Sequence, residues 1–135
     1  MKGIADTGFL VAFANGRDAH HRWARELAEE VDEPLLTCES VLSEASFHLR
    51  SVTTVVAMVR EGLVRLAFNA NDHLPQLSAL ALRFAARRPD FADLCLIRMS
   101  ELHPKHSVIT TDRDDFRVYR RNNREVIPTI VPPAR

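Results

Sequence analysis

Short apolar runs alternate with longer helical patterns along this chain, and this alternation constrains the fold more than any other feature. Runs of strand length are expected at residues 2–5, 35–37, 63–68, 107–111 and 125–131. A short helix is expected through Phe9, Leu10 and Phe13, and longer helices over residues 19–32, 39–50, 53–61, 72–88, 91–103 and 115–121. Strands that alternate with helices predict an α/β fold in three layers, α/β/α, around a central parallel sheet.

Several residues indicate where these helices begin and end. Asp18 is expected to cap the helix over 19–32, and Gly62 lies at the expected end of the helix over 53–61. Helical spacing predicts the following inward residues for the helix over 72–88: Leu74, Leu77, Ala81, Phe84 and Ala85. No internal repeat or linker-like segment interrupts the pattern. The 135 residues, 1–135, are therefore expected to form a single domain.

Four carboxylates are expected to meet at one edge of this sheet. Asp6 and Asp112 each follow an apolar strand, and ligands of open α/β sheets bind beyond the carboxyl ends of the strands. Glu44 and Asp93 lie in helical segments with mostly apolar neighbours. Carboxylates this close repel one another, and a hard divalent cation with oxygen ligands relieves the repulsion. The pattern therefore favours a metal-dependent phosphodiester chemistry.

Each of these acids also has a purely structural interpretation, and the sequence leaves these alternatives open. Asp6 and Asp112 are placed to cap the helices that follow them, and Asp93 is three residues after a possible cap at Asp90. Glu44 would be neutralised by an arginine such as Arg50 or Arg98. Asp114 and Asp115 are both candidates for a further acid beside Asp112. The coincidence of four acids at one sheet edge favours a site.

Other familiar sites are excluded by composition. The only glycines are at positions 3, 8, 16 and 62, so neither a P-loop nor a GxGxxG motif is present. Cys38 and Cys95 belong to no zinc-binding pattern, and we expect buried, reduced thiols within helical segments of a cytoplasmic protein. The apolar run at the start of the chain contains Asp6 and is too short to cross a bilayer, so no membrane association is expected.

Binding of a nucleic acid would require a local basic patch, because the formal net charge is zero. Arginines cluster beyond Asp112 and before Asp93, at positions 113, 117, 120, 121 and 124 and at positions 87 and 88. Phosphate contacts from this patch would make RNA binding sensitive to salt. The alternative is that these arginines form an ordinary solvated helix face. Few exposed aromatic residues are expected, so extended base stacking is not predicted.

The four acidic segments also resemble a known family. They are residues 4–10 (IADTGFL), 39–45 (ESVLSEA), 91–97 (FADLCLI) and 110–116 (TTDRDDF), and in this order they resemble the acidic motifs of PIN-domain ribonucleases. They are most similar to the VapC-type toxins of bacterial toxin–antitoxin pairs. The stretch 18–21 (DAHH) also resembles the family. The resemblance implies a PIN-like domain and an endoribonuclease that hydrolyses RNA phosphodiester bonds.

The resemblance also implies roles for individual residues and partners. Mg²⁺ or Mn²⁺ would be held by catalytic carboxylates at Asp6, Glu44, Asp93 and Asp112, with Asp115 as a secondary ligand. Thr7 and Thr111 would bind a phosphate or a metal-bound water, while Arg113 and Arg117 from the basic patch are our candidates for substrate contacts. The implied partners are RNA, a cognate antitoxin protein and a second copy of the chain in a homodimer. The alternatives are a PIN-like nuclease of RNA or DNA without a toxin role, and a non-catalytic PIN-like binding module.

Overall fold

A five-stranded sheet, all of whose paired strands are parallel, forms the centre of the computed structural model, which describes residues 1–134. Its strands are β1 (Gly3–Ala5), β2 (Leu35–Thr37), β3 (Val64–Leu66), β4 (Ser107–Ile109) and β7 (Thr129–Ile130), in the spatial order β3-β2-β1-β4-β7. Ile4 of the central strand is in register with Leu36 on one side and Val108 on the other. Strand order reverses at β1, because β2 and β4 lie on its two sides.

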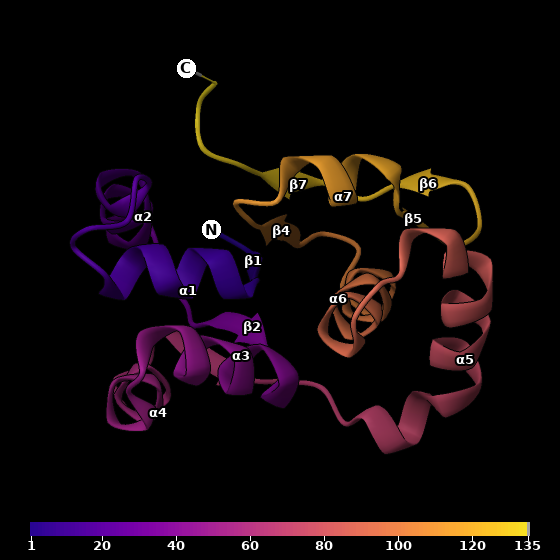
Figure 1. Cartoon of the computed structure of the whole chain (residues 1–135), viewed down its shortest axis with the longest axis horizontal. Helices are drawn as coiled ribbons and strands as arrows, with labels where there is room; N and C mark the ends of the chain where they lie inside the picture. Colours follow the sequence, from indigo (N-terminus) through magenta and orange to yellow (C-terminus); the bar gives the residue numbers. More distant parts are fainter. Residues whose placement is uncertain (135) are drawn as a thin grey trace.

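Helices cover both faces of the sheet, which confirms the predicted three-layer α/β/α fold with a central parallel sheet (Figure 1). The first group packs together as α1 (Thr7–Ala14), α2 (His21–Glu29), α3 (Glu39–Leu49) and α4 (Val52–Arg60). The second group contains α5 (Leu74–Arg83) and α6 (Phe91–Leu102). A short helix, α7 (Arg113–Val118), follows β4, and a small antiparallel pair is formed by β5 (Arg120–Arg121) and β6 (Glu125–Val126).

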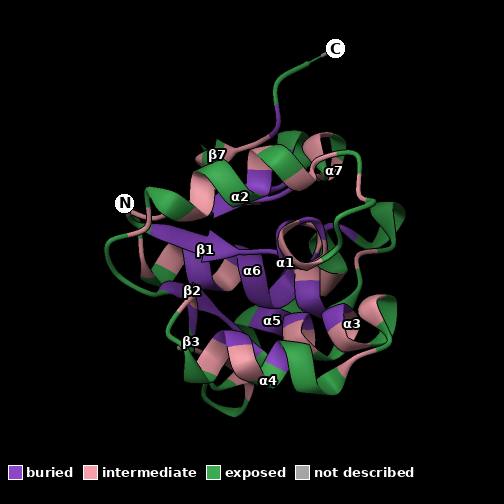
Figure 2. Ribbon diagram, turned by 90° about the vertical axis from the view of Figure 1, so that its left-hand side faces the viewer, coloured by how far each residue is buried: buried purple, intermediate pink, exposed green. Residues whose placement is uncertain are grey.

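The inner strands β1 and β2 are buried on both sides, as expected of a parallel sheet between two helical layers, whereas the edge strands β3 and β7 are partly exposed. Every residue of β1 and β2 is buried, and α6 contributes seven buried residues to the same core (Figure 2). Gly3 packs closely here: a Cβ at this position would lie 2.7 Å from Cδ1 of Ile109 and 2.9 Å from Cδ2 of Leu35, so these side chains would have to move. Within residues 1–134, no helix combines the length and apolar character that crossing a bilayer requires.

The predicted helix over residues 72–88 is wrong in its extent. The structure has α5 over only Leu74–Arg83, with 3₁₀ turns at Ala70–His73 and Ala85–Arg87. Pro75 lies in the first turn of α5, where its missing N–H is not needed for a helical hydrogen bond, so it favours a helix start at this point. Leu77 and Phe84 are buried as predicted, whereas Leu74 and Ala85 are exposed.

Three other expected elements differ in detail. The helix over 19–32 is only His21–Glu29, because the Asp18 side chain accepts the backbone N–H of His20 in a turn and does not cap the helix. The strand over 125–131 is divided into β6 and β7, which belong to different sheets, and Pro128 lies between them and has no N–H to donate. The last helix begins at Arg113, two residues earlier than expected. Cys38 and Cys95 are both buried as expected, but Cys38 precedes α3 as its N-cap instead of lying within a helix.

Candidate active site

A cleft of about 470 Å³ opens at the carboxyl edge of the sheet, and all the acids proposed from the sequence line it. They are Asp6, Glu44, Asp93, Asp112 and Asp115, together with Asp18 and Asp90. Thr7 and Thr111 line the same cleft. Among its lining residues within 1–134 there is no lysine or arginine, and the basic side chains are His20 and His48. The cleft is therefore strongly acidic, and its carboxylates come from five separate segments of the chain.

Asp6 is the most buried of these acids, with 9% of its surface exposed. It lies between β1 and α1 and caps α1, because its Oδ1 accepts the backbone N–H of Thr7 at 2.7 Å. Its Oδ2 accepts the hydroxyl of Thr110 at 2.6 Å. Burial raises the pKa of Asp6 to about 6, against the lowering effect of these two hydrogen bonds. The two interpretations of Asp6 are therefore compatible, because the same carboxylate caps α1 and lines the cleft.

Thr110 is a site residue that the sequence did not identify. It is fully buried at the end of β4, where its hydroxyl donates to Asp6 and accepts the backbone N–H of Asp112 at 2.9 Å. One hydroxyl thus connects the two aspartates that follow β1 and β4. The only signal in the sequence was a polar residue at the end of an apolar strand, which is too common to single out.

Glu44 projects from α3 into the cleft and has no arginine partner within residues 1–134. Its Oε2 accepts the Thr7 hydroxyl at 3.2 Å. Arg98 instead pairs with Glu101 at 3.1 Å, so the suggested neutralisation of Glu44 by Arg98 is wrong. Partial burial, followed by the charge of Asp90, raises the pKa of Glu44.

Asp93 is held by a second residue that the sequence did not identify, Tyr119. The Tyr119 hydroxyl donates to Oδ2 of Asp93 at 3.1 Å, and its buried ring packs edge-on against Phe84 and Phe116. Burial and the neighbouring charge of Asp90 raise the pKa of Asp93 to about 7. Asp90 caps α6 by accepting the backbone N–H of Asp93 at 2.8 Å, as the sequence indicated.

The last motif contributes Asp112 and Asp115 to the cleft. Asp112 caps α7 and accepts the backbone N–H of Asp115 at 3.1 Å, while partial burial and the proximity of Asp115 raise the pKa of Asp112. Asp115 also pairs with Arg87 at 2.7 Å. Asp114 is exposed and is not among the residues that line the cleft, so Asp115 is the better placed of the two candidates.

Gly8 allows the two ends of the site to approach each other. A Cβ at position 8 would lie 2.0 Å from Oγ1 of Thr111, which is far inside the contact distance. The first turn of α1 therefore accepts Thr111 against its backbone only because residue 8 has no side chain. The sequence offered no signal for this role beyond the presence of Gly8 in the 4–10 segment that resembles the PIN-domain motifs.

The basic patch is smaller than the sequence suggested. Arg121 is buried and donates to the carbonyl of Ser100 at 2.8 Å, so its predicted place on an RNA-binding surface is wrong. Arg120 donates to backbone carbonyls of its own turn, and Arg113 donates to the carbonyl of Pro132 at 2.5 Å. Arg117 and Arg124 remain exposed.

The chemistry of the cleft fits a hard divalent cation, although no group of three potential ligands is already arranged as a metal site within residues 1–134. Its acids are oxygen donors, and the pKa values of Asp6, Glu44, Asp93 and Asp112 are all raised by burial and by neighbouring carboxylates. Raised pKa values mean that the ionised forms lack compensation, and a cation bound by oxygen ligands supplies it. The two cysteines lie outside the cleft, so no soft ligand competes.

The fold and the sequence together identify the family. The sequence model of the PIN domain matches residues 4–122, and the chain belongs to the PIN domain family. Among solved structures, the chain is similar to VapC20 of Mycobacterium tuberculosis, a toxin that cleaves the sarcin–ricin loop. The TM-score is 0.64 at 23% sequence identity, and the match covers 75% of this chain and 82% of that one, which establishes a shared fold. No match was found among curated proteins.

Proposed function

We propose that this chain is a metal-dependent endoribonuclease that acts as the toxin of a toxin–antitoxin pair. The observation that carries the proposal is the convergence of four uncompensated carboxylates in one cleft of a PIN domain. Asp6, Glu44, Asp93 and Asp112 are the proposed catalytic residues, and with Asp115 they would hold Mg²⁺ or Mn²⁺. A divalent cation at such a site lowers the pKa of an attacking water and neutralises charge on the scissile phosphate and the leaving oxygen.

The side chains around these carboxylates fix their positions. The Thr110 hydroxyl and the N–H of Thr7 each donate to one oxygen of Asp6, and the Tyr119 hydroxyl donates to one oxygen of Asp93, while both aspartates line the cleft. Preorganisation of this kind lowers the reorganisation needed when charge develops in the transition state. The Thr7 and Thr111 hydroxyls also line the cleft and are proposed to contact the substrate phosphate.

Binding of RNA is proposed to use phosphate contacts beside the acidic cleft. Arg117 on α7 is exposed, and Arg113 lies beside Thr111 in a shallow pocket that extends to Pro133. Arginine suits bidentate binding of phosphate. These contacts would hold the RNA backbone while the carboxylates act on one phosphodiester bond.

The toxin assignment rests on the motif resemblance and on the shared fold with VapC20. It implies a cognate antitoxin, and an antitoxin arginine facing the cleft would be paired with its carboxylates. The helical pair α3–α4 is the proposed surface for the antitoxin, because Phe47, Val52 and Val56 are exposed there. A homodimer is proposed on the same resemblance.

The test is cleavage of total cellular RNA by the purified chain with Mg²⁺ or Mn²⁺, compared with EDTA and with the Asp6→Asn variant. Discrete cleavage that requires both the metal and Asp6 is expected. Cleavage of DNA alone would indicate a PIN-like nuclease of another role. A folded, antitoxin-free protein that cleaves nothing, and whose RNA binding survives Asp6→Asn without metal, would indicate a binding module.

A further inference from the structure

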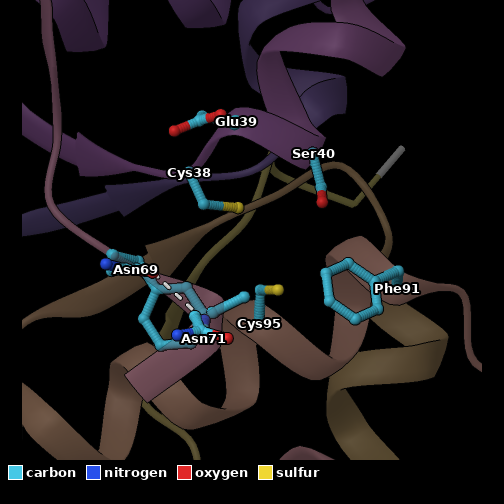
Figure 3. A pocket seen from close by; sticks show the side chains of 9 residues that line it. Cys38, Glu39, Ser40, Asn69, Asn71, Phe91 and Cys95 are labelled. Atoms are coloured by element: carbon cyan, nitrogen blue, oxygen red, sulfur yellow. Dashed lines mark hydrogen bonds between the residues drawn. The ribbon is translucent and has the colours of Figure 1, made fainter. Parts of the chain in front are cut away.

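A second pocket, of about 440 Å³, lies outside the acidic cleft (Figure 3). It is bounded by the start of α3, the segment between β3 and α5, and the first turns of α6. Figure 3 shows Ser40 directed into the space between α3 and α6, with Phe91 on one side and Asn69 and Asn71 on the other. The thiols of Cys38 and Cys95 lie between them.

The pocket combines aromatic rings with amide groups. Phe91 is 50% exposed, although it begins a helix that is otherwise largely buried. Phe68 is half-buried and stacked on His73, with ring centroids 5.0 Å apart and planes inclined by 17°, which fixes the orientation of its ring. Oδ1 of Asn69 accepts the backbone N–H of Asn71 at 3.1 Å, so the amide nitrogen of Asn69 remains available as a donor. Aromatic rings beside amides match the flat faces and polar edges of nucleobases.

The charges of the lining argue against a phosphate as the ligand. Among the lining residues within 1–134 there is no lysine, arginine or histidine, and the one charged side chain is the carboxylate of Glu39. An anion would be repelled by Glu39 and would find no cationic partner. A neutral ring with N–H donors suits this lining, because Glu39 and the amide oxygen of Asn71 are acceptors.

The pocket and the acidic cleft share two helices. Ser40 of the pocket and Glu44 of the cleft are four residues apart on α3, and so lie on the same face one turn apart. Phe91 of the pocket lies between Asp90 and Asp93 of the cleft on α6. A nucleic-acid strand with one phosphate at the carboxylates would therefore have a neighbouring base within reach of the pocket.

We propose that this pocket binds a single unpaired nucleobase next to the scissile phosphate and thereby selects the sequence that is cut. This inference rests on the proposed ribonuclease activity and adds a specificity site to it. Phe91 supplies the stacking surface, and Asn71 supplies hydrogen bonds to the edge of the base. One base is thus selected by a pocket, in keeping with the sequence-based expectation that extended base stacking is not used.

Binding is tested first, without cleavage. Adenosine, guanosine, cytidine and uridine are each titrated in EDTA into the ¹⁵N-labelled protein, and amide shifts are followed by NMR. One nucleoside is expected to shift amides of residues 68–71 and 91–95, and Phe91→Ala and Asn71→Ala are expected to weaken its binding about tenfold. Leu82→Ala is the control, because Leu82 is an exposed apolar residue, 78% accessible, that lines neither the pocket nor the acidic cleft.

The same three variants are then compared in metal-dependent cleavage of total RNA, with the cut ends mapped by sequencing. Phe91→Ala and Asn71→Ala are expected to raise KM with little change in kcat and to relax the nucleotide preference at one position beside the cut. No shift at these amides with any nucleoside, an equal effect of Leu82→Ala, or an unchanged cleavage preference would overturn the proposal. Nucleoside binding in a wild-type protein that cleaves no RNA would instead refute the ribonuclease function, so the two failures are distinguishable.

Discussion

Replacing Asp6 with asparagine is expected to stabilise the metal-free protein at pH 8 while abolishing its nuclease activity. Burial raises the pKa of Asp6 from an ordinary value of 3.8 to about 6. This difference corresponds to about 3 kcal/mol of destabilisation of the folded state when the carboxylate is ionised. Asparagine removes the charge but forfeits one of the two hydrogen bonds now accepted from Thr7 and Thr110, which costs about 1 kcal/mol. The net gain is about 2 kcal/mol.

The pH dependence of this gain follows from the sign of the shift. Because the folded pKa is the higher one, the native state retains a proton that the unfolded state loses between pH 3.8 and about 6. The wild type therefore loses stability as pH rises through this interval, and the full penalty is present above it. The advantage of Asp6→Asn should be largest at pH 8 and should disappear below pH 4.

Thermal and urea unfolding in EDTA at pH 8 and pH 4 measure this effect. A net gain of about 2 kcal/mol corresponds to a rise in Tm of about 6–10 °C for a domain of this size. Mg²⁺ should raise the Tm of the wild type and leave that of the variant nearly unchanged. Asp114→Asn is the control, since Asp114 is exposed and does not line the cleft. A destabilising charge on Asp6 is refuted if Asp6→Asn is no more stable than wild type at pH 8, or if the difference in free energy of unfolding is the same at pH 4.

Four further substitutions test the surroundings of the site and the role of the arginines. Tyr119→Phe removes the hydrogen bond to Asp93, and the Mn²⁺ concentration for half-maximal cleavage should rise about tenfold with the fold preserved; an unchanged metal requirement would contradict this. Gly8→Ala introduces a Cβ that would clash with the Thr111 hydroxyl and displace it, so RNA cleavage should fall by about tenfold or more. The free energy of unfolding should change little, because alanine favours the helix by about 1 kcal/mol relative to glycine. Arg121→Ala should lower the free energy of unfolding by about 2–4 kcal/mol, because it leaves the buried Ser100 carbonyl unpaired. Arg117→Ala should only weaken RNA binding and its salt dependence. Equal stability of the two variants would count against these assignments.

The fold was predictable from the sequence because the alternation of strands and helices does not depend on the exact residues at which each element begins or ends. The strands form at apolar runs that are separated by helical segments. Because β1 and β4 are parallel neighbours, Asp6 and Asp112 lie at the same edge of the sheet. The errors occurred where a local residue overrides the pattern. Pro75 and Pro128 redefine a helix and a strand, and the Asp18 side chain binds a turn instead of a helix end.

The acids of the candidate site were predictable, but the residues that hold them were not. A carboxylate in an apolar stretch is conspicuous in a sequence, because burying it without a partner is unfavourable. Thr110 and Tyr119 are ordinary residues for a strand end and for a core, and only their contacts across the fold distinguish them. Arg121 illustrates the opposite error, since Arg117 and Arg124 of the same predicted patch are exposed while the Arg121 side chain is buried and bonds to the Ser100 carbonyl.

The hydroxyl shared by Asp6 and Asp112 also determines when during biosynthesis the site can form. Thr110, the partner of Asp6, is 104 residues later in the chain. Until β4 has been synthesised and has paired with β1, Asp6 cannot accept the Thr110 hydrogen bond, and Asp112 is not positioned beside it. A chain synthesised only as far as β3 therefore lacks the proposed catalytic centre, because that centre needs residues from both ends of the sheet-forming sequence.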